Sequence, residues 1–317
     1  MKTWQFIKNC IESRRAVMLL YVLESNGSSP GRQGFHMAVD AHGNMCGSIG
    51  GGIMEHKMVE MAKARLAEGT TMETIHRQVH DKAAKKDQSG MICSGEQTIF
   101  LRELTTRELP FISAMLTSMG ACTNGTLTLS LKGLTFSDDI PLQNFFFKQY
   151  SSGDFLLQEK TGLKNRLHII GGGHCSLALS KLMSGLDFHI SVYEERSHLN
   201  TMEENVYAHR KNLLHSYDKL SECISGGENV YVVIMTFGYR TDDIAVRALV
   251  GKEYRYVGLL GSKSKIEKLF SVYQNSELDK EVLAKIHSPI GLQIKSQTPE
   301  EIAISIAAEI IAEKNRS

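Results

Sequence analysis

The stretch HIIGGGHCSLALSKL, residues 168–182, restricts the possible folds of this chain more than any other. An apolar strand ends in three glycines, a helix follows directly, and the next apolar strand ends at Glu194. Gly171 allows a tight turn and Gly173 lets the backbone approach a phosphate, while the amide groups and dipole of the helix favour an anion. Glu194 stands where dinucleotide-binding domains carry their ribose-binding acid. The pattern predicts a Rossmann-like unit; the alternative is that the glycines only pack the helix against the strand.

The rest of the C-terminal half repeats this alternation of strands and helices. Residues 230–235, VYVVIM, are apolar throughout, as expected of a strand that is covered on both faces. Another strand is expected at 256–260, with helices at 241–250 and 299–313. Alternating strands and helices favour a mostly parallel sheet. We therefore predict an α/β fold in which a Rossmann-like domain forms the C-terminal half of the chain.

The N-terminal half predicts a different, mixed α+β domain. Charged residues and serines become frequent around residues 151–165, which indicates a linker. The total of 317 residues favours two domains, which we place at residues 1–155 and 156–317. The elements expected first are a helix at 2–13, a strand at 16–24, a hairpin of 35–40 and 44–49, and a helix at 53–66.

A second glycine triplet, Gly50–Gly52, follows the expected hairpin rather than a parallel strand, so the dinucleotide interpretation fails there. Three glycines ahead of a helix still form a nest of amide groups that suits an anion. Glu55 falls in the first helical turn, where it either complements the helix dipole or lines a ligand site together with the triplet. In the second interpretation, the site faces the loop GSSPGRQG, residues 27–34.

Three further features are candidate sites. His76 and His80 have the i,i+4 spacing that brings two imidazoles together on a helix, although no H-E-x-x-H pattern accompanies them. Cys93, in MICSGEQ, is either exposed as a metal candidate or a small buried hydrophobic residue. A strand is expected to end at Gly261, and Ser262 then opens a lysine-rich helix. Ser262, Lys263 and Lys265 either cradle a phosphate or form a solvated start of that helix.

Composition excludes several classes of function. The formal net charge is +1, so the sequence gives no electrostatic basis for nucleic-acid binding. The apolar run at residues 16–23 is too short to span a bilayer, so no membrane association is expected. Six cysteines without a C-x-x-C pair fit a reducing cytoplasm rather than a disulfide scaffold or a zinc knuckle. The sequence contains no nucleophile elbow and no Walker A loop, and it predicts no catalytic residue.

Five stretches of the sequence resemble the xanthine dehydrogenase accessory protein family (XdhC/CoxI). Residues 26–56, NGSSPGRQGFHMAVDAHGNMCGSIGGGIMEH, resemble the N-terminal domain of that family. Residues 167–196, LHIIGGGHCSLALSKLMSGLDFHISVYEER, resemble its C-terminal Rossmann domain. The same domain is matched by MTFGYRTDD at 235–243, VGLLGSKSK at 257–265 and PIGLQIKSQTPEEIAISIAAEI at 289–310.

The resemblance implies a chaperone that binds the molybdenum cofactor, as molybdopterin or in its dinucleotide form. Such a protein shields the cofactor and inserts it into a molybdenum hydroxylase of the xanthine dehydrogenase type. The resemblance further implies a cysteine desulfurase as a second partner, a homodimer and a cytoplasmic location. One glycine nest would hold the phosphate end of the cofactor and the other its pterin or metal end. The family often has Cys-Gly-Gly where this chain has Cys93-Ser94-Gly95, which leaves the role of Cys93 open.

The residues expected to bind the cofactor combine both glycine triplets with the loops near them. They are Ser28, Ser29, Arg32, Gly50, Gly51, Gly52, Glu55, Gly171, Gly172, Gly173, His174, Glu194, Arg196, Gly238, Asp242, Gly261, Ser262 and Lys263.

Two other functions compete with the chaperone. An NAD(P)-dependent oxidoreductase would use Gly171, Gly173 and Glu194, but no His or Lys stands out as the acid for hydride transfer. A Rossmann-like scaffold that binds only protein partners is the third possibility. Fold alone does not choose among them. The N-terminal signature has no role in a simple dehydrogenase, which favours an accessory factor without turnover of its own.

Overall fold

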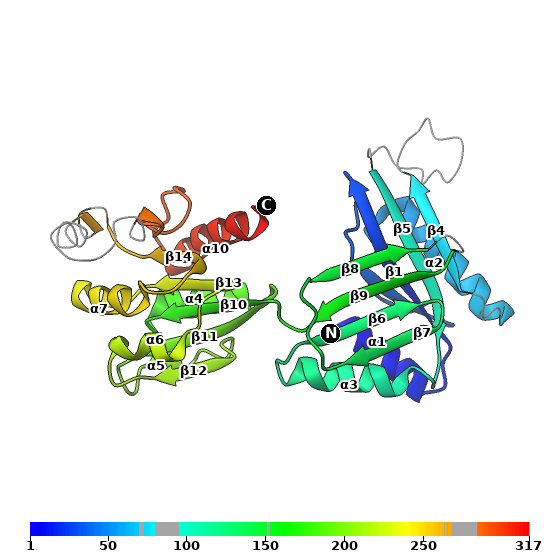
Figure 1. The fold of residues 1–317 in the computed structure, drawn as a ribbon, viewed down its shortest axis with the longest axis horizontal. Coiled ribbons are helices and arrows are strands. Elements are labelled where there is room, and N and C mark those ends of the chain that lie inside the picture. Colours follow the sequence, from blue (N-terminus) through cyan, green and yellow to red (C-terminus); the bar gives the residue numbers. More distant parts are fainter. Residues whose placement is uncertain are drawn as a thin grey trace. The chain divides into compact units, whose positions relative to one another are not determined.

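The chain forms two compact units, Met1–Gly162 and Leu163–Ser317 (Figure 1). The division expected after residue 155 falls inside strand β9 (Phe155–Thr161), after its first residue, and this strand pairs with two strands of the first unit. The segment interpreted as a linker therefore contains a strand. The computed structural model describes residues 1–69, 73–79, 95–150, 153–262, 264, 266–267 and 284–316.

The described part of the first unit contains two antiparallel sheets and the helices α1 (Lys2–Glu12), α2 (Gly52–Glu68) and α3 (Leu109–Gly120). Sheet A has the order β3-β2-β1-β5-β4, with β1 (Val17–Gly27), β2 (His36–Asp40), β3 (Met45–Gly47), β4 (Thr74–Val79) and β5 (Gly95–Leu104). Sheet B has the order β7-β6-β9-β8, with β6 (Gly125–Ser130), β7 (Gly133–Ser137) and β8 (Phe145–Gln149) beside β9.

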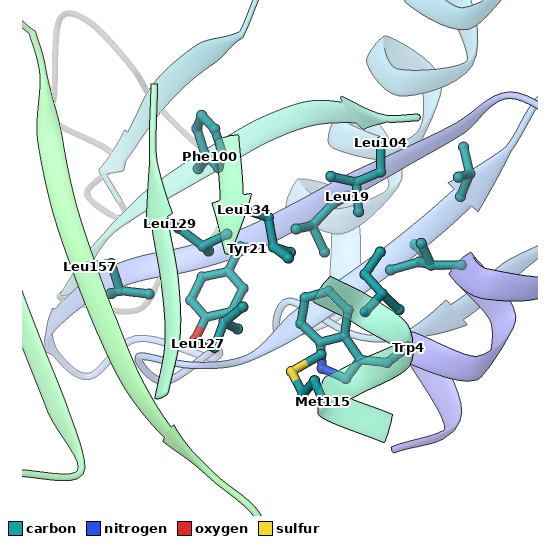
Figure 2. Close-up of a cluster of buried hydrophobic side chains, with 14 of the residues drawn as sticks. Trp4, Leu19, Tyr21, Phe100, Leu104, Met115, Leu127, Leu129, Leu134 and Leu157 are labelled. Atoms are coloured by element: carbon teal, nitrogen blue, oxygen red, sulfur yellow. The ribbon is translucent and has the colours of Figure 1, made fainter. Parts of the chain in front are cut away.

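The first seven residues of β1, 17–23, are buried on both faces of the strand, which explains their unbroken apolar sequence. Leu19 and Tyr21 face a core that sheet A shares with sheet B, α1 and α3 (Figure 2). Leu20 and Val22 point to the opposite face and pack with α2. Because side chains alternate along a strand, only a run of apolar residues can satisfy both faces. The hairpin of β2 and β3 pairs with β1, and the helix α2 comes next in the chain, as the sequence predicted.

The second unit contains a parallel sheet, sheet C, with the order β12-β11-β10-β13-β14. One face packs against α4 and α10, and the other packs against α6, α7 and the 3-10 helix η1. The strands are β10 (Asn165–Ile170), β11 (Phe188–Glu194), β12 (Arg210–Leu213), β13 (Gly227–Ile234) and β14 (Tyr254–Leu259). Among the residues that the structure describes, the helices with defined bounds are α4 (His174–Met183), α5 (Asn200–Glu203), η1 (Tyr217–Lys219), α6 (Leu220–Cys223), α7 (Tyr239–Leu249) and α10 (Pro299–Asn315).

The predicted α/β class is confirmed, with a mixed first unit and a Rossmann-like second unit. The helical interpretation of His76 is wrong, because His76 lies in β4, where its Nε2 is 2.9 Å from the Thr74 hydroxyl oxygen. His80 lies outside the described residues. No helix in the part of the chain that the structure describes is long and apolar enough to span a membrane.

Candidate functional site

The candidate site lies where the order of sheet C changes direction, between β10 and β13. The chain leaves β10 toward β11 and β12 on one side and returns to β13 and β14 on the other. Ligands of open parallel sheets bind outside the carboxyl ends of the strands at such a point. The turns after β10 and β13, residues 171–173 and 235–238, meet there. A Cβ atom on Gly171 would lie 2.4 Å from the carbonyl oxygen of Met235.

Gly171 and Gly173 have different environments. The φ angle of Gly171 is +107°, and the backbone of Met235 and Thr236 leaves no room for a side chain. Gly173, the N-cap of α4, has φ −74°, and a Cβ atom there would meet nothing within 4 Å among the described residues. Neither the conformation nor the packing of Gly173 requires glycine, so the space beside it is open to a ligand. The first turn of α4 contains no acidic residue and begins at the exposed His174, which suits an anion.

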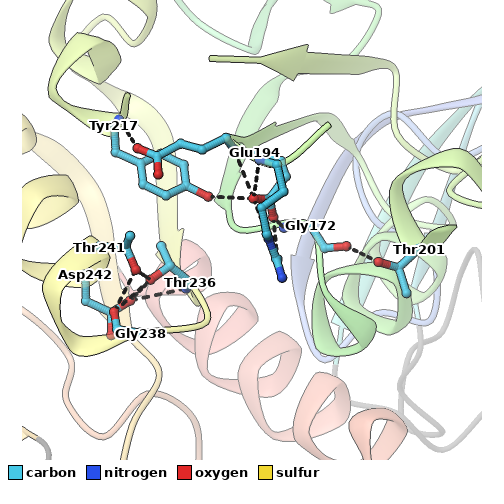
Figure 3. Close-up of polar contacts among 10 residues, drawn as sticks. Gly172, Glu194, Thr201, Tyr217, Thr236, Gly238, Thr241 and Asp242 are labelled. Atoms are coloured by element: carbon cyan, nitrogen blue, oxygen red, sulfur yellow. Dashed lines mark hydrogen bonds and ion pairs between the residues drawn. The ribbon is translucent and has the colours of Figure 1, made fainter. Parts of the chain in front are cut away.

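Glu194, at the end of β11, is buried next to this turn (Figure 3). The residue is 1% exposed, and its Oε2 accepts a hydrogen bond from the Gly172 amide at 2.7 Å. Arg196 donates from Nε to Oε1 at 2.9 Å and from Nη2 to Oε2 at 2.8 Å. The backbone amides of Glu195 and Arg196 also donate to Oε1. A carboxylate offers about four acceptor positions, so these donors saturate that of Glu194.

These contacts fix the charge and the role of Glu194. Burial by itself would raise the pKa of the carboxyl group, but the hydrogen bonds from Arg196 and Gly172 outweigh burial and lower the pKa to about 2. The ionised carboxylate therefore holds the glycine turn in place. A ribose hydroxyl, the partner that the sequence pattern suggested, would have to displace one of the present donors.

A second polar network holds the turn between β13 and α7 (Figure 3). Asp242 is fully buried and accepts hydrogen bonds from the Thr236 amide at 3.2 Å and the Thr236 hydroxyl at 2.6 Å. The Thr241 hydroxyl donates to the carbonyl oxygen of Gly238, the N-cap of α7, at 2.8 Å. Asp242 therefore holds the turn through hydrogen bonds inside the fold, whereas Gly238 is part of the turn.

Gly261 and Ser262 follow β14, which runs parallel to β10 and β13. They therefore lie at the same edge of the sheet as Gly173, as the sequence predicted. Ser262 is exposed, and its hydroxyl oxygen is 3.1 Å from that of Ser264. Lys263 lies outside the described residues. The predicted residues at this edge are Gly171, Gly172, Gly173, His174, Glu194, Arg196, Gly238, Asp242, Gly261 and Ser262.

In the first unit, the Gly50–Gly52 nest is filled by the chain's own carboxylate. Its glycines have φ angles of +129°, +77° and +72°. Oε2 of Glu55 accepts hydrogen bonds from the Ile49 amide at 2.9 Å, the Gly51 amide at 3.0 Å and the Ser48 hydroxyl at 2.7 Å. Burial would raise the pKa of Glu55, but these hydrogen bonds outweigh it and lower the pKa. A phosphate bound to the same amides would have to displace Glu55.

Replacing Glu55 by glutamine should destabilise the first unit, because the neutral amide accepts more weakly and brings its own NH₂ group toward the amide donors. Hydrogen bonds to charged groups contribute about 1.5–3 kcal/mol, so we expect the free energy of unfolding to fall by roughly 2 kcal/mol. Trp4, the single tryptophan of the chain, is buried in the core of this unit. Urea unfolding followed by Trp4 fluorescence therefore measures the effect.

The matched control is Glu60→Gln, in the same helix, whose exposed carboxylate accepts a hydrogen bond from Lys63 at 2.9 Å. Its effect should be much smaller than that of Glu55→Gln, because water and salt screen an exposed ion pair. If both variants lowered the free energy of unfolding equally, Glu55 would have no special role in the nest.

The loop of residues 27–34 lies against the triplet. A Cβ atom on Gly50 would lie 2.6 Å from the backbone nitrogen of Gly31. Gln97, in β5 and 1% exposed, joins the two segments, since its Nε2 donates to the carbonyl oxygens of Gly31 and Ile49, each at 3.1 Å. Sequence reasoning missed Gln97. A glutamine within an apolar strand was the available signal, because buried polar groups are nearly always hydrogen-bonded.

The other predicted residues of the first unit differ in exposure. Ser28 and Arg32 are exposed, and Nη1 of Arg32 donates to the carbonyl oxygen of Gly27 at 3.0 Å. Ser29 is buried, and its hydroxyl donates to a backbone carbonyl of the same loop. Cys93 lies outside the described residues. Among the residues that are described, no group of three or more His, Cys, Asp or Glu side chains is arranged to hold a metal ion.

Comparison with known proteins identifies relatives over the whole chain. A protein of Escherichia coli K12 called uncharacterized protein YqeB is 24% identical over 93% of this chain, which spans only 43% of that relative. A Bacillus subtilis protein, named as one of the probable subunits of xanthine dehydrogenase, is 24% identical over 96% of both chains. The crystal structure of a xanthine dehydrogenase from Bacillus halodurans shares the fold, with a TM-score of 0.73 and 23% identity over 100% of this chain and 97% of that one.

Two family models match the chain in the order that the two units have. Residues 10–77 match the XdhC and CoxI family, and residues 167–310 match the XdhC Rossmann domain. The second match begins within β10 and contains β11 to β14 and every predicted residue at the edge of sheet C. The two matches together cover more than half of the sequence, and the chain therefore belongs to the XdhC and CoxI family.

Proposed function

We propose that this protein binds the molybdenum cofactor at the edge of sheet C and delivers it to a molybdenum hydroxylase of the xanthine dehydrogenase type. The proposal rests on Gly173. Neither the backbone conformation nor the packing of this residue requires glycine, and the space beside it is open to a ligand. Amide groups in the first turn of a helix lack partners within the helix and attract an anion. Family membership and the name of the Bacillus subtilis relative support this choice of ligand.

The residues present fit a cofactor that carries a phosphate or a pyrophosphate. The amides of Gly173 and His174 would bind the phosphate, while Gly171 forms the turn and Glu194 holds it through Gly172. When bound, the cofactor supplies the molybdenum centre that the partner enzyme uses. The contribution of this chain is binding and orientation, and a cysteine desulfurase that modifies the bound cofactor belongs to the same proposal.

An NAD(P)-dependent oxidoreductase is the second candidate. The strand order of sheet C and the place of Glu194 at the end of β11 both match dinucleotide-binding domains. The saturated carboxylate of Glu194 argues against it, because a ribose hydroxyl would compete with the guanidinium of Arg196.

Purification from a host that makes molybdenum cofactor separates the two candidates. The protein should contain pterin in roughly stoichiometric amount, measured by acid oxidation to the fluorescent product. It should show no NAD(P) turnover with alcohols, hydroxy acids or purines. Nicotinamide turnover at ordinary enzymatic rates, with no pterin bound after reconstitution, would overturn the accessory role and support the oxidoreductase.

Gly173→Val should weaken binding of the phosphate-bearing cofactor at least about tenfold without lowering the melting temperature. A valine side chain would fill the open space beside the first turn of α4, whereas φ of −74° is accessible to any residue. Titration of cofactor against both proteins gives the affinities.

Gly251→Val is the matched control, because a Cβ atom there also meets nothing within 4 Å and the residue follows α7, away from the carboxyl ends of the strands. If Gly173→Val bound cofactor as tightly as Gly251→Val does, the turn would have only a structural role.

A further inference from the structure

The side chains of Arg196 and Phe237 meet across the glycine turn. Arg196 follows β11 and Phe237 follows β13, and these strands flank β10 on its two sides. The guanidinium carbon of Arg196 lies 4.9 Å from the centroid of the Phe237 ring. A contact between side chains from opposite sides of β10 must pass over its carboxyl end, where Gly171–Gly173 begins.

Arg196 is held as a fixed plane in this contact. Two of its nitrogens donate to the two oxygens of Glu194, which prevents the guanidinium group from rotating. Glu194 is itself fixed, because the Gly172 amide donates to it and the residue is 1% exposed. The ion pair neutralises much of the charge, so the planar face of Arg196 remains as its main binding surface.

Phe237 is 71% exposed, although the adjoining residues Met235 and Thr236 are buried. An exposed phenylalanine at the sheet edge where open parallel sheets bind their ligands stabilises the fold little, since most of its ring stays in water. One ring face is covered by Arg196, an arrangement that is favourable for a guanidinium group over an aromatic ring. Because the residue is 71% exposed, the other ring face is open to solvent, and flat nitrogen heterocycles stack on such aromatic faces.

We propose that Phe237, with Arg196 packed against one face of its ring, offers the other face as a stacking platform for the flat heterocyclic ring of a ligand whose phosphate lies at the Gly171–Gly173 turn. Glu194 is the positioning residue that sets the plane of Arg196, rather than a ligand of ribose. This inference rests on the proposed function and adds to it the recognition of a ring system. The shared chemistry is a nitrogen heterocycle linked to phosphate, whether a pterin or a nucleobase.

Phe237→Ala should weaken binding of ring-bearing phosphates about tenfold, the size of effect expected for loss of one stacking partner. Affinity for inorganic pyrophosphate should stay within about twofold, because the phosphate site is untouched. Phe237→Tyr should restore ring binding. Isothermal titration of the full chain with neopterin triphosphate, GMP, NADH and pyrophosphate measures these affinities, and thermal melts establish that each variant is folded.

Phe146→Ala is the matched control, since Phe146 is a 43% exposed phenylalanine on β8 of the first unit. It should bind every probe as the wild type does. Arg196→Met, which retains the length of the side chain without the planar group, should weaken ring binding like Phe237→Ala. Arg196→Lys should fail to restore it, because a lysine keeps the charge but not the plane.

The probes distinguish failure of the stacking platform from failure of the proposed function. If the wild type binds neopterin triphosphate and Phe237→Ala binds it equally well, the platform is overturned and the proposed function stands. If only NADH depends on Phe237 and no pterin binds, the platform is supported for a nucleobase and the proposed function fails. If none of the ring-bearing probes binds the wild type, both are overturned.

Discussion

Gly171→Val is expected to lower the free energy of unfolding of the second unit by roughly 4 kcal/mol, which is about 10 °C in melting temperature. Two costs combine. A φ angle of +107° is strongly unfavourable for a β-branched residue. The new Cβ atom would also lie 2.4 Å from the Met235 carbonyl oxygen and 3.0 Å from the Thr236 Cα atom. These backbone atoms directly follow the central strand β13, so they cannot move aside without disturbing it.

Two spectroscopic signals locate this effect. Far-UV circular dichroism reports both units, whereas the fluorescence of Trp4 reports the first unit, in whose core it is buried. The dichroism transition of Gly171→Val should move to lower temperature, while the Trp4 transition stays near that of the wild type. Gly173→Val, two residues along, should melt like the wild type. If the two valine variants melted together, the close approach of the two turns would be refuted.

The sequence was sufficient to predict the second unit because its determinants are local. The apolar strand before Gly171, the helix after Gly173 and the acid at Glu194 all follow each other within one βαβ unit. Alternation of strands and helices then implies the parallel sheet. The structure adds what the sequence pattern could not contain, namely that Arg196 and Gly172 already satisfy the carboxylate of Glu194. Whether the carboxylate of Glu194 is saturated depends on which hydrogen-bond donors point toward it, and the spacing of a sequence motif does not give the direction of a side chain.

The first unit was harder to predict because its sheets are built from distant antiparallel segments. Strand β4 pairs with β5, and the helical interpretation of His76 missed this pairing. Residues four apart share a face in a strand as well as in a helix, although they are then about 13 Å apart. Glu55 shows the same limit of prediction from sequence. Both interpretations placed it correctly in the first turn of α2, but neither gave the partners of its carboxylate. Only the structure shows its carboxylate inside the nest of glycine amides.

His168 should make the second unit sensitive to acid. The residue is 7% exposed on β10, with Nδ1 3.0 Å from the Tyr193 hydroxyl oxygen. Burial, followed by the charges of Arg166 and His189, lowers the pKa of His168 from 6.5 to about 4. Above pH 6.5 the imidazole of His168 is mostly neutral in both the folded protein and the unfolded chain. Below it, the unfolded chain binds a proton that the folded protein does not, so stability falls from about pH 6.5 to pH 4, by about 3 kcal/mol in total.

His168→Gln isolates this contribution, since glutamine keeps a polar partner for the Tyr193 hydroxyl but does not titrate. The variant should be less stable than the wild type at pH 7, because its side chain fills the site less well. Between pH 7 and pH 4 it should lose about 3 kcal/mol less than the wild type, as measured by urea unfolding followed by circular dichroism. His189 and His209, whose pKa values burial also lowers, contribute equally to both proteins. Parallel profiles for wild type and His168→Gln would mean that the folded protein protonates His168 as readily as the unfolded chain does, which its burial against Tyr193 forbids.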